Sequence, residues 1–295
     1  MIKNKVNRKN ICVLDGEISF IEVVPKRTIS QIPIFFAPGW GGIVHPGVVE
    51  IIKTLGKKSR HSIAIDHPHN IQSVSTQIPA AIVKKYAFAE VRKAAALLAF
   101  LEKMRIRKVD VLAHSEGAIY TLIAAAAKSD YFRDIILTNP VGLIDQDNLL
   151  KIATRRITSI ISPDRKRPHA TSTTKGRILS GKRFRTPRIA TLKGEGRAGF
   201  ILKSPITAVQ DAISLANSHV HSLLRDLDQR RIRVVILACA NDRLVHLEKL
   251  QAVLSSADGV DGFLTFEGGH TEILRYPRGY ALAVDEILNS LNSAS

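Results

Sequence analysis

The sequence contains few cysteines and no long apolar run, and each shortage excludes a class of protein. Two cysteines in 295 residues cannot build a disulfide framework or a cysteine-rich zinc site. Cys12 and Cys239 both lie in runs typical of β-strands, where we expect buried free thiols. No segment approaches the roughly 18 apolar residues of a membrane-spanning helix, and the charged N-terminus lacks a signal-peptide stretch. We therefore expect a cytoplasmic protein, with peripheral attachment to a membrane left open.

Aromatic residues are also scarce, at 5%, while the apolar content of 45% is ordinary for a globular protein. Short β-type runs alternate with longer helical patterns along most of the chain. This alternation predicts an α/β fold with a mostly parallel central sheet of about eight strands, flanked by helices. The expected strands cover 11–14, 18–24, 32–37, 61–65, 108–113, 135–138, 233–240 and 260–266, and the expected helices cover 46–57, 80–104, 115–128, 207–230, 246–256 and 276–292.

The spacing of these runs also predicts how the chain is organised. Only Asp15 and Gly16 separate the first two expected strands, which indicates a hairpin at the sheet edge. The alternation stops near Pro140 and resumes near Thr207. We therefore expect one core domain, residues 1–140 and 207–295, interrupted by an insert of residues 141–206, whose middle has little apolar periodicity.

Three residues able to form a catalytic triad each follow an expected strand, where parallel sheets gather functional side chains. Ser115 lies in the stretch AHSEG between a strand and an alanine-rich helix, the pattern of a nucleophile elbow. Asp242 and His270 follow the last two strands. Each has an ordinary alternative, as a helix-capping serine, an Asx-turn aspartate or a surface histidine. Their joint occurrence favours one mechanism, in which His270 takes the proton of Ser115 and Asp242 orients His270.

A glycine-rich turn, APGWGG, completes the candidate site after the strand at 32–37. Its flexible backbone can aim an amide at a developing oxyanion, and we predict that the amides of Trp40 and Glu116 form the oxyanion hole. A plain turn before a helix is the alternative. The Trp40 side chain is a candidate wall of the acyl pocket, and His114 is the second candidate substrate contact.

Taken together, these residues make the chain resemble the α/β-hydrolase fold family of serine hydrolases. The resemblance covers about residues 15–140 and 207–293. The chain departs from the family pattern at Ala113, which stands in place of the first elbow glycine, and at Pro38, where histidine is frequent. The motifs that carry the resemblance are PGWGG at 38–42, DHP at 66–68, the elbow at Ser115, Asp242 and His270.

The resemblance implies further features of the chain. It implies that residues 141–206 form an inserted basic lid that shapes substrate choice, and that no cofactor is required. Some family members take their acid from the preceding strand, which makes Asp145 and Asp147 back-up candidates. We expect no metal site, because the pair of histidines in His67-Pro68-His69 lacks the further ligands that zinc needs.

Positive charge is concentrated in this insert. The chain has a formal charge of +17, and residues 151–203 hold fifteen Lys and Arg against two acidic residues, which is +13 of that total. The segment could attract an anionic substrate such as a coenzyme A thioester, bind an anionic membrane surface, or be merely solvated. Nucleic-acid binding is disfavoured, because only Phe184 and Phe200 are available for stacking.

The sequence therefore predicts a serine hydrolase that cleaves a carboxylic ester or related acyl bond through an acyl-enzyme intermediate. An acyltransferase, or a thioesterase acting on an anionic acyl carrier, would use the same triad and remains open. A non-catalytic binding protein on a hydrolase scaffold is the alternative from another class. The acyl group and the leaving group are not determined by the sequence.

Overall fold

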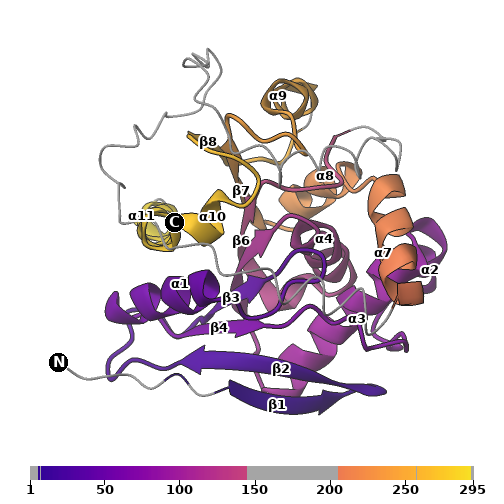
Figure 1. The fold of residues 1–295 in the computed structure, drawn as a ribbon, viewed down its shortest axis with the longest axis horizontal. Coiled ribbons are helices and arrows are strands. Elements are labelled where there is room, and N and C mark those ends of the chain that lie inside the picture. Colours follow the sequence, from indigo (N-terminus) through magenta and orange to yellow (C-terminus); the bar gives the residue numbers. More distant parts are fainter. Residues whose placement is uncertain (1–5, 7, 145–204, 257, 294–295) are drawn as a thin grey trace.

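The computed structural model describes residues 6, 8–144, 205–256 and 258–293, which build one eight-stranded sheet with helices on both faces (Figure 1). The spatial order of the strands is β1-β2-β4-β3-β5-β6-β7-β8. Strands β3 to β8 run parallel, and β1 and β2 are antiparallel at one edge. Their bounds are β1 Arg8–Val13, β2 Gly16–Val23, β3 Ile34–Ala37, β4 Ser62–Ile65, β5 Val109–His114, β6 Phe132–Thr138, β7 Arg233–Cys239 and β8 Gly262–Phe266. The predicted sheet and its edge hairpin are confirmed.

Helices cover the sheet in two layers (Figure 1). One layer consists of α1, α10 and α11, and the other of α3, α4 and α8. The bounds are α1 Pro46–Lys57, α2 Ala80–Lys85, α3 Phe88–Lys103, α4 Gly117–Ala127, a short 3₁₀ turn Ser129–Tyr131, α7 Pro205–Asn217, α8 Ser222–Gln229, α9 Leu247–Ser256, α10 Glu272–Arg275 and α11 Pro277–Ser293.

Successive side chains on a strand point to opposite faces of the sheet, and apolar side chains on both faces pack against helices. Phe35 packs into the layer of α3 and α4, while its neighbour Phe36 packs into the layer of α1 and α11. Both are buried, as is the whole of β5 at the centre of the sheet. A strand that is apolar on both faces is typical of a parallel sheet covered by helices. The C-terminal ends of these strands consequently meet at one edge, where the loops that follow them come together.

Two of the predicted helices are interrupted in the structure. The pattern at 80–104 becomes α2 and α3, because Tyr86 and Ala87 have extended backbone. The pattern at 207–230 becomes α7 and α8, separated by residues 218–221. The four-residue α10 was not predicted. Most of the insert at 141–206, residues 145–204, lies outside the described residues, so its assignment as a separate unit stays a prediction.

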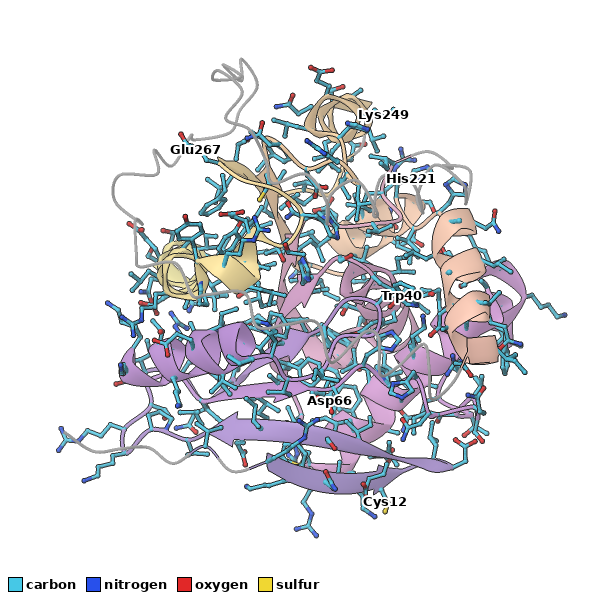
Figure 2. The ribbon with its side chains drawn as sticks, viewed as in Figure 1. Cys12, Trp40, Asp66, His221, Lys249 and Glu267 are labelled. Carbon is cyan, nitrogen blue, oxygen red and sulfur yellow. The ribbon has the colours of Figure 1, made fainter. Side chains whose placement is uncertain are left out.

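One prediction about the cysteines is wrong. Cys239 is buried as expected, but Cys12 is exposed. Cys12 lies on β1, an edge strand whose outer side has no neighbour in the sheet, and Figure 2 shows it at the periphery of the molecule. A strand-like sequence therefore did not imply burial here, because edge strands are covered on fewer sides.

Candidate active site

Ser115 occupies the turn between β5 and α4 with a φ of 57°, a left-handed conformation that residues other than glycine rarely adopt. Its amide donates a hydrogen bond of 3.0 Å to the carbonyl of Thr138, which fixes the turn against β6. Gly117 lets α4 begin close to β3, since a Cβ there would lie 2.4 Å from the carbonyl oxygen of Ala37. The result is a strained strand-to-helix turn with the geometry of the predicted nucleophile elbow.

The structure brings together the three side chains predicted for the triad. His270 Nε2 lies 2.7 Å from Ser115 Oγ, and His270 Nδ1 lies 2.7 Å from Asp242 Oδ2. The other oxygen of Asp242 accepts hydrogen bonds from the amides of Leu244 and Val245, at 2.8 and 3.0 Å. Asp242 thus makes an Asx turn, the ordinary role considered for it in the sequence, and it also contacts His270. With all three side chains buried, little solvent is present to compete for these hydrogen bonds.

The backbone of His270 is held by two further side chains. Its carbonyl oxygen accepts hydrogen bonds from Asn139 Nδ2 at 3.0 Å and from His114 Nε2 at 2.9 Å. Asn139 follows β6 directly, and its Oδ1 accepts from the amide of Cys239 at 2.8 Å. Sequence reasoning missed Asn139, although a polar residue at the end of a buried strand was visible. This ring nitrogen of His114 contacts the protein itself, which favours positioning of His270 over the substrate contact predicted for His114.

The loop that carries Trp40 packs directly on the elbow. A Cβ at Gly39 would lie 2.8 Å from Ser115 Cβ, so only glycine permits this approach. The amide of Gly42 donates to the carbonyl of Gly39 at 2.8 Å and closes the turn around Trp40. Trp40 is partly buried. Both predicted oxyanion donors, the amides of Trp40 and Glu116, therefore belong to segments in contact at Ser115.

Beneath the elbow lies a cluster of buried charges that the sequence analysis did not foresee. Lys93 Nζ lies 2.7 Å from Glu90 Oε1, 2.7 Å from Glu116 Oε1 and 3.5 Å from Asp211 Oδ1. Arg92 pairs with the same Asp211 oxygen at 2.8 Å. The signal was present in α3, where Glu90, Arg92 and Lys93 stand directly before an apolar, alanine-rich run. Charges are almost never buried unless they are paired, and these pairs join α3, the elbow and α7.

The carboxyl groups in this cluster differ in their affinity for protons. Burial alone would raise the pKa of Glu116, but the charge of Lys93 and the hydrogen bond from His67 lower it to about 2. Burial raises the pKa of Glu90 to about 7, against the opposing charge of Lys93. Glu116 is therefore ionised across the ordinary pH range, while Glu90 titrates near neutrality.

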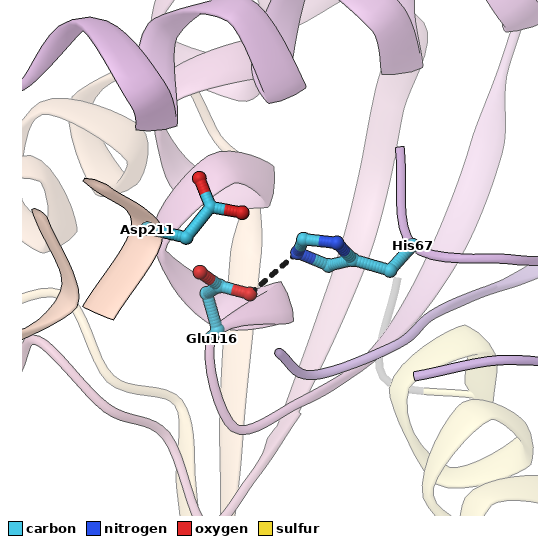
Figure 3. A group of neighbouring side chains, drawn as sticks. All are labelled: His67, Glu116 and Asp211. Atoms are coloured by element: carbon cyan, nitrogen blue, oxygen red, sulfur yellow. Dashed lines mark hydrogen bonds and ion pairs between the residues drawn. The ribbon is translucent and has the colours of Figure 1, made fainter. Parts of the chain in front are cut away.

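Three members of this region could in principle ligate a metal. Donor atoms of His67, Glu116 and Asp211 all lie within 4.8 Å of one another (Figure 3), and His67 Nε2 donates a 2.6 Å hydrogen bond to Glu116 Oε2. The ammonium of Lys93 already supplies positive charge to both carboxylates. The arrangement therefore suits an internal cation, and the expectation that the site needs no metal stays a prediction.

Two sequence predictions concern residues beyond this geometry. Asp145 and Asp147, the back-up acids, lie outside the described residues, as does the basic segment at 151–203. Among the residues that the structure describes, none of the helices combines the length and the apolarity needed to cross a membrane.

Comparison with known proteins gives structural relatives only. Neither a protein-family model nor a curated protein matches the sequence. Among solved structures, a serine hydrolase from Cycloclasticus zankles is 13% identical with a TM-score of 0.63, over 97% of this chain and 99% of the other. An enol-lactonase from Burkholderia xenovorans is 10% identical with a TM-score of 0.61, over 95% and 100%.

A thermophilic esterase from Thermogutta terrifontis is also similar in structure over nearly the whole chain. It is 15% identical with a TM-score of 0.58, and the match covers 96% of this chain and 98% of the esterase. Similarity of this extent over whole chains establishes a shared fold. At such low identity it does not establish a shared reaction, which has to be argued from the residues of the site.

Proposed function

We propose that this chain, which has the α/β-hydrolase fold, is a serine hydrolase that cleaves a carboxylic ester or a related acyl bond. The observation that carries the proposal is the unbroken pair of hydrogen bonds from Asp242 through His270 to Ser115. A serine is a weak nucleophile until a base accepts its proton, and this geometry supplies that base together with a carboxylate that orients it.

The proposed reaction proceeds in two halves. Ser115 Oγ attacks the carbonyl carbon while its proton passes to His270 Nε2, and the tetrahedral intermediate expels the leaving group as His270 returns the proton. Water then attacks the acyl-enzyme with His270 again acting as base, which releases the acid and restores Ser115. Asp242 holds the Nδ1–H tautomer and stabilises the imidazolium in both halves. No cofactor enters either step.

The amides of Trp40 and Glu116 are the proposed donors to the oxyanion. The packing of Gly39 on Ser115 supports this assignment, since it brings the 38–42 loop against the elbow. Donors of this kind stabilise the charge that develops in the transition state, and loss of one lowers kcat by about 100- to 1,000-fold in well-studied cases. The Trp40 side chain is the proposed wall of the acyl pocket.

The test is hydrolysis of p-nitrophenyl esters of graded chain length by wild type and by Ser115→Ala. We expect the variant to lose at least about 1,000-fold in kcat, because removal of a triad nucleophile has an effect of this order. A fluorophosphonate probe should label wild type and not the variant. Ser290→Ala, which changes an exposed serine on α11, is the matched control and should keep full activity and labelling.

The same experiment separates the alternatives. Wild type and Ser115→Ala that are equally inert and equally unlabelled would contradict the hydrolase and favour a non-catalytic binding protein. Labelling without hydrolysis, with product formed only when an alcohol or amine is added, would indicate an acyltransferase. Preference for acyl thioesters of coenzyme A over neutral esters would indicate a thioesterase for an anionic carrier.

An anionic partner for the basic segment at 151–203 is part of the proposal. One observation favours a membrane surface over a soluble anion. The helix that follows the segment, α7, exposes Ile206, Val209 and Ile213 at spacings that place them along one side of the helix. A basic segment followed in the sequence by an exposed apolar stripe has the composition of a chain that binds anionic lipid.

A further inference from the structure

The buried ion pairs beneath the elbow are the largest feature that the proposed reaction does not use. Lys93 is fully buried and meets carboxylates from α3, the elbow and α7. Burying an ammonium carries a large desolvation penalty, and an apolar replacement of such a cluster is often neutral or stabilising. Stability is therefore a weak reason for this cluster to stand next to Ser115.

Glu116 connects the cluster to the proposed chemistry. Its amide is a proposed oxyanion donor, and both oxygens of its side chain are engaged: Oε1 with Lys93 at 2.7 Å and Oε2 with His67 at 2.6 Å. The side chain is thus fixed at its far end while the backbone begins α4. The peptide between Ser115 and Glu116 consequently has little freedom to turn its N–H away from the site.

His67 extends this connection to the other oxyanion donor. The amide of His67 donates to the carbonyl of Gly42 at 2.7 Å, and Gly42 donates to Gly39 at 2.8 Å. These two bonds brace the turn that carries Trp40. A second brace comes from Tyr120 on α4, whose hydroxyl donates to the carbonyl of Pro38 at 2.8 Å. The contacts that begin at Lys93 therefore extend to the segments of both proposed oxyanion donors, the amides of Trp40 and Glu116.

The negative charge of Glu116 is a further reason for a lysine beside the elbow. An ionised carboxylate one residue after the nucleophile would oppose the negative charge that forms on the substrate oxygen. The ammonium of Lys93, 2.7 Å from that carboxylate, offsets the opposition. Glu116 can thus fix the backbone without weakening the oxyanion hole.

We propose that Lys93, Glu116 and His67 form a positioning relay that sets the separation of the two oxyanion amides. The side chains of the relay contact no reacting atom and act through the backbone of Glu116 and of the 38–42 loop. This inference rests on the proposed acyl hydrolysis at Ser115, and it adds three side chains whose removal should affect the transition state more than substrate binding.

The test compares Lys93→Met, Glu116→Gln and the double variant Lys93→Met/Glu116→Leu with wild type. Lys103→Met, which changes an exposed lysine on the same helix, is the matched control. The measurements are kcat and KM on p-nitrophenyl butyrate, affinity for an alkyl boronic acid that mimics the tetrahedral intermediate, and Tm. The double variant replaces the ion pair by apolar side chains, so it separates stability from positioning.

We expect kcat to fall about 10- to 100-fold in Lys93→Met and in the double variant, a fraction of what loss of a whole oxyanion donor causes. Boronic-acid affinity should fall in parallel, while KM changes less than about threefold and Lys103→Met matches wild type. The double variant should keep a Tm close to that of wild type and should not regain kcat. Glu116→Gln, which keeps the shape of the side chain, should lose less.

Either of the two variants that lack Lys93 can decide the question if it folds. Folded Lys93→Met or a folded double variant with kcat within twofold of wild type would overturn the relay and leave the hydrolase proposal standing. Recovery of both Tm and kcat in the double variant would show a purely structural role and would also overturn it. Wild type that neither hydrolyses esters nor reacts with fluorophosphonate would instead remove the proposed function on which the relay rests.

Discussion

Glu90 shows how burial changes the chemistry of a single carboxyl group. Its Oε1 contacts Lys93 and accepts a hydrogen bond from Ser214 at 3.1 Å, but its Oε2 has no hydrogen-bond partner among the described residues. Ionised Glu90 is therefore poorly stabilised, and burial raises its pKa to about 7. In the unfolded chain the pKa returns to about 4.5.

This difference predicts a pH dependence of stability. Between pH 4.5 and 7 the unfolded chain releases the Glu90 proton and the folded chain keeps it, so this group lowers the free energy of unfolding as pH rises. Glu90→Gln cannot titrate and should lose less stability across that window. Urea unfolding of both proteins at several pH values from 4.5 to 7.5 measures the slopes. If the free energy of unfolding changed with pH by the same amount in both proteins, the raised pKa of Glu90 would be contradicted, whatever the constant difference between them.

The residues of the site were predictable where their positions follow from strand ends. Ser115, Asp242 and His270 each follow a recognisable apolar strand, so the sheet brings them together without further information. The contacts of Asn139 and Lys93 could not be predicted, because they depend on which residues oppose them in three dimensions. Lys93 lies 23 positions from Glu116 in the sequence. Asp211, its third partner, follows the insert in the sequence. Nothing in local periodicity specifies such pairs.

Among the elements, the junction of β3 with α4 depends most sharply on one residue. A Cβ at Gly117 would lie 2.4 Å from the carbonyl oxygen of Ala37 and 2.9 Å from that of Pro38, and backbone atoms cannot move aside singly. The first turn of α4 would have to shift, and it carries the amide of Glu116. The packing of α4 on β3 and the geometry of the proposed oxyanion hole are therefore coupled at this glycine.

Gly117→Ala should destabilise the protein by about 1–3 kcal/mol, the usual effect of overpacking. It should also lower kcat by about tenfold or more, since small displacements of positioning groups have large kinetic effects. Gly262→Ala on β8 is the matched control, because the atoms nearest to its Cβ would be those of the Val235 side chain, at 3.4 Å or more. We expect Gly262→Ala to stay within about 1 kcal/mol of wild type. Urea unfolding and esterase kinetics measure both effects, and equal behaviour of the two variants would contradict the argument.

Element boundaries were predictable only where the sequence marks them. Helix α1 matches the expectation at 46–57, because Pro46 starts it and His45 Nδ1 accepts from the amide of Gly47. The break between α2 and α3 has no such mark, since residues 80–104 contain neither glycine nor proline. The break is seen only in the backbone of Tyr86 and Ala87, which leaves the helical conformation there.

The whole molecule carries its charge unevenly. Residues 151–203 hold +13 of the net +17, and the remainder of the chain is close to balanced. Such asymmetry attracts anions over a distance of about one Debye length, roughly 8 Å at physiological ionic strength. Partners of the chain should therefore be selected by charge at this segment.

Binding to lipid vesicles tests this charge and the apolar stripe on α7 together. We expect binding to phosphatidylcholine vesicles only when phosphatidylserine is added, and binding should weaken as NaCl rises. Replacing Ile206, Val209 and Ile213 by serine should weaken binding about tenfold, since it removes the apolar contribution. Ile29→Ser, at an exposed apolar residue elsewhere, is the control. Co-sedimentation measures both, and failure to bind any vesicle would favour a soluble anionic substrate.

Because the two cysteines differ in burial, their thiols should react at very different rates in the folded protein. Folded chains offer a thiol reagent one fast site, Cys12, while burial raises the pKa of Cys239 to about 12 and withholds its thiolate. Cys239 is bonded through its amide to Asn139, which also holds the carbonyl of His270. The rate at which the thiol of Cys239 is modified therefore measures how often the chain opens around His270, in the unlabelled, unmutated protein.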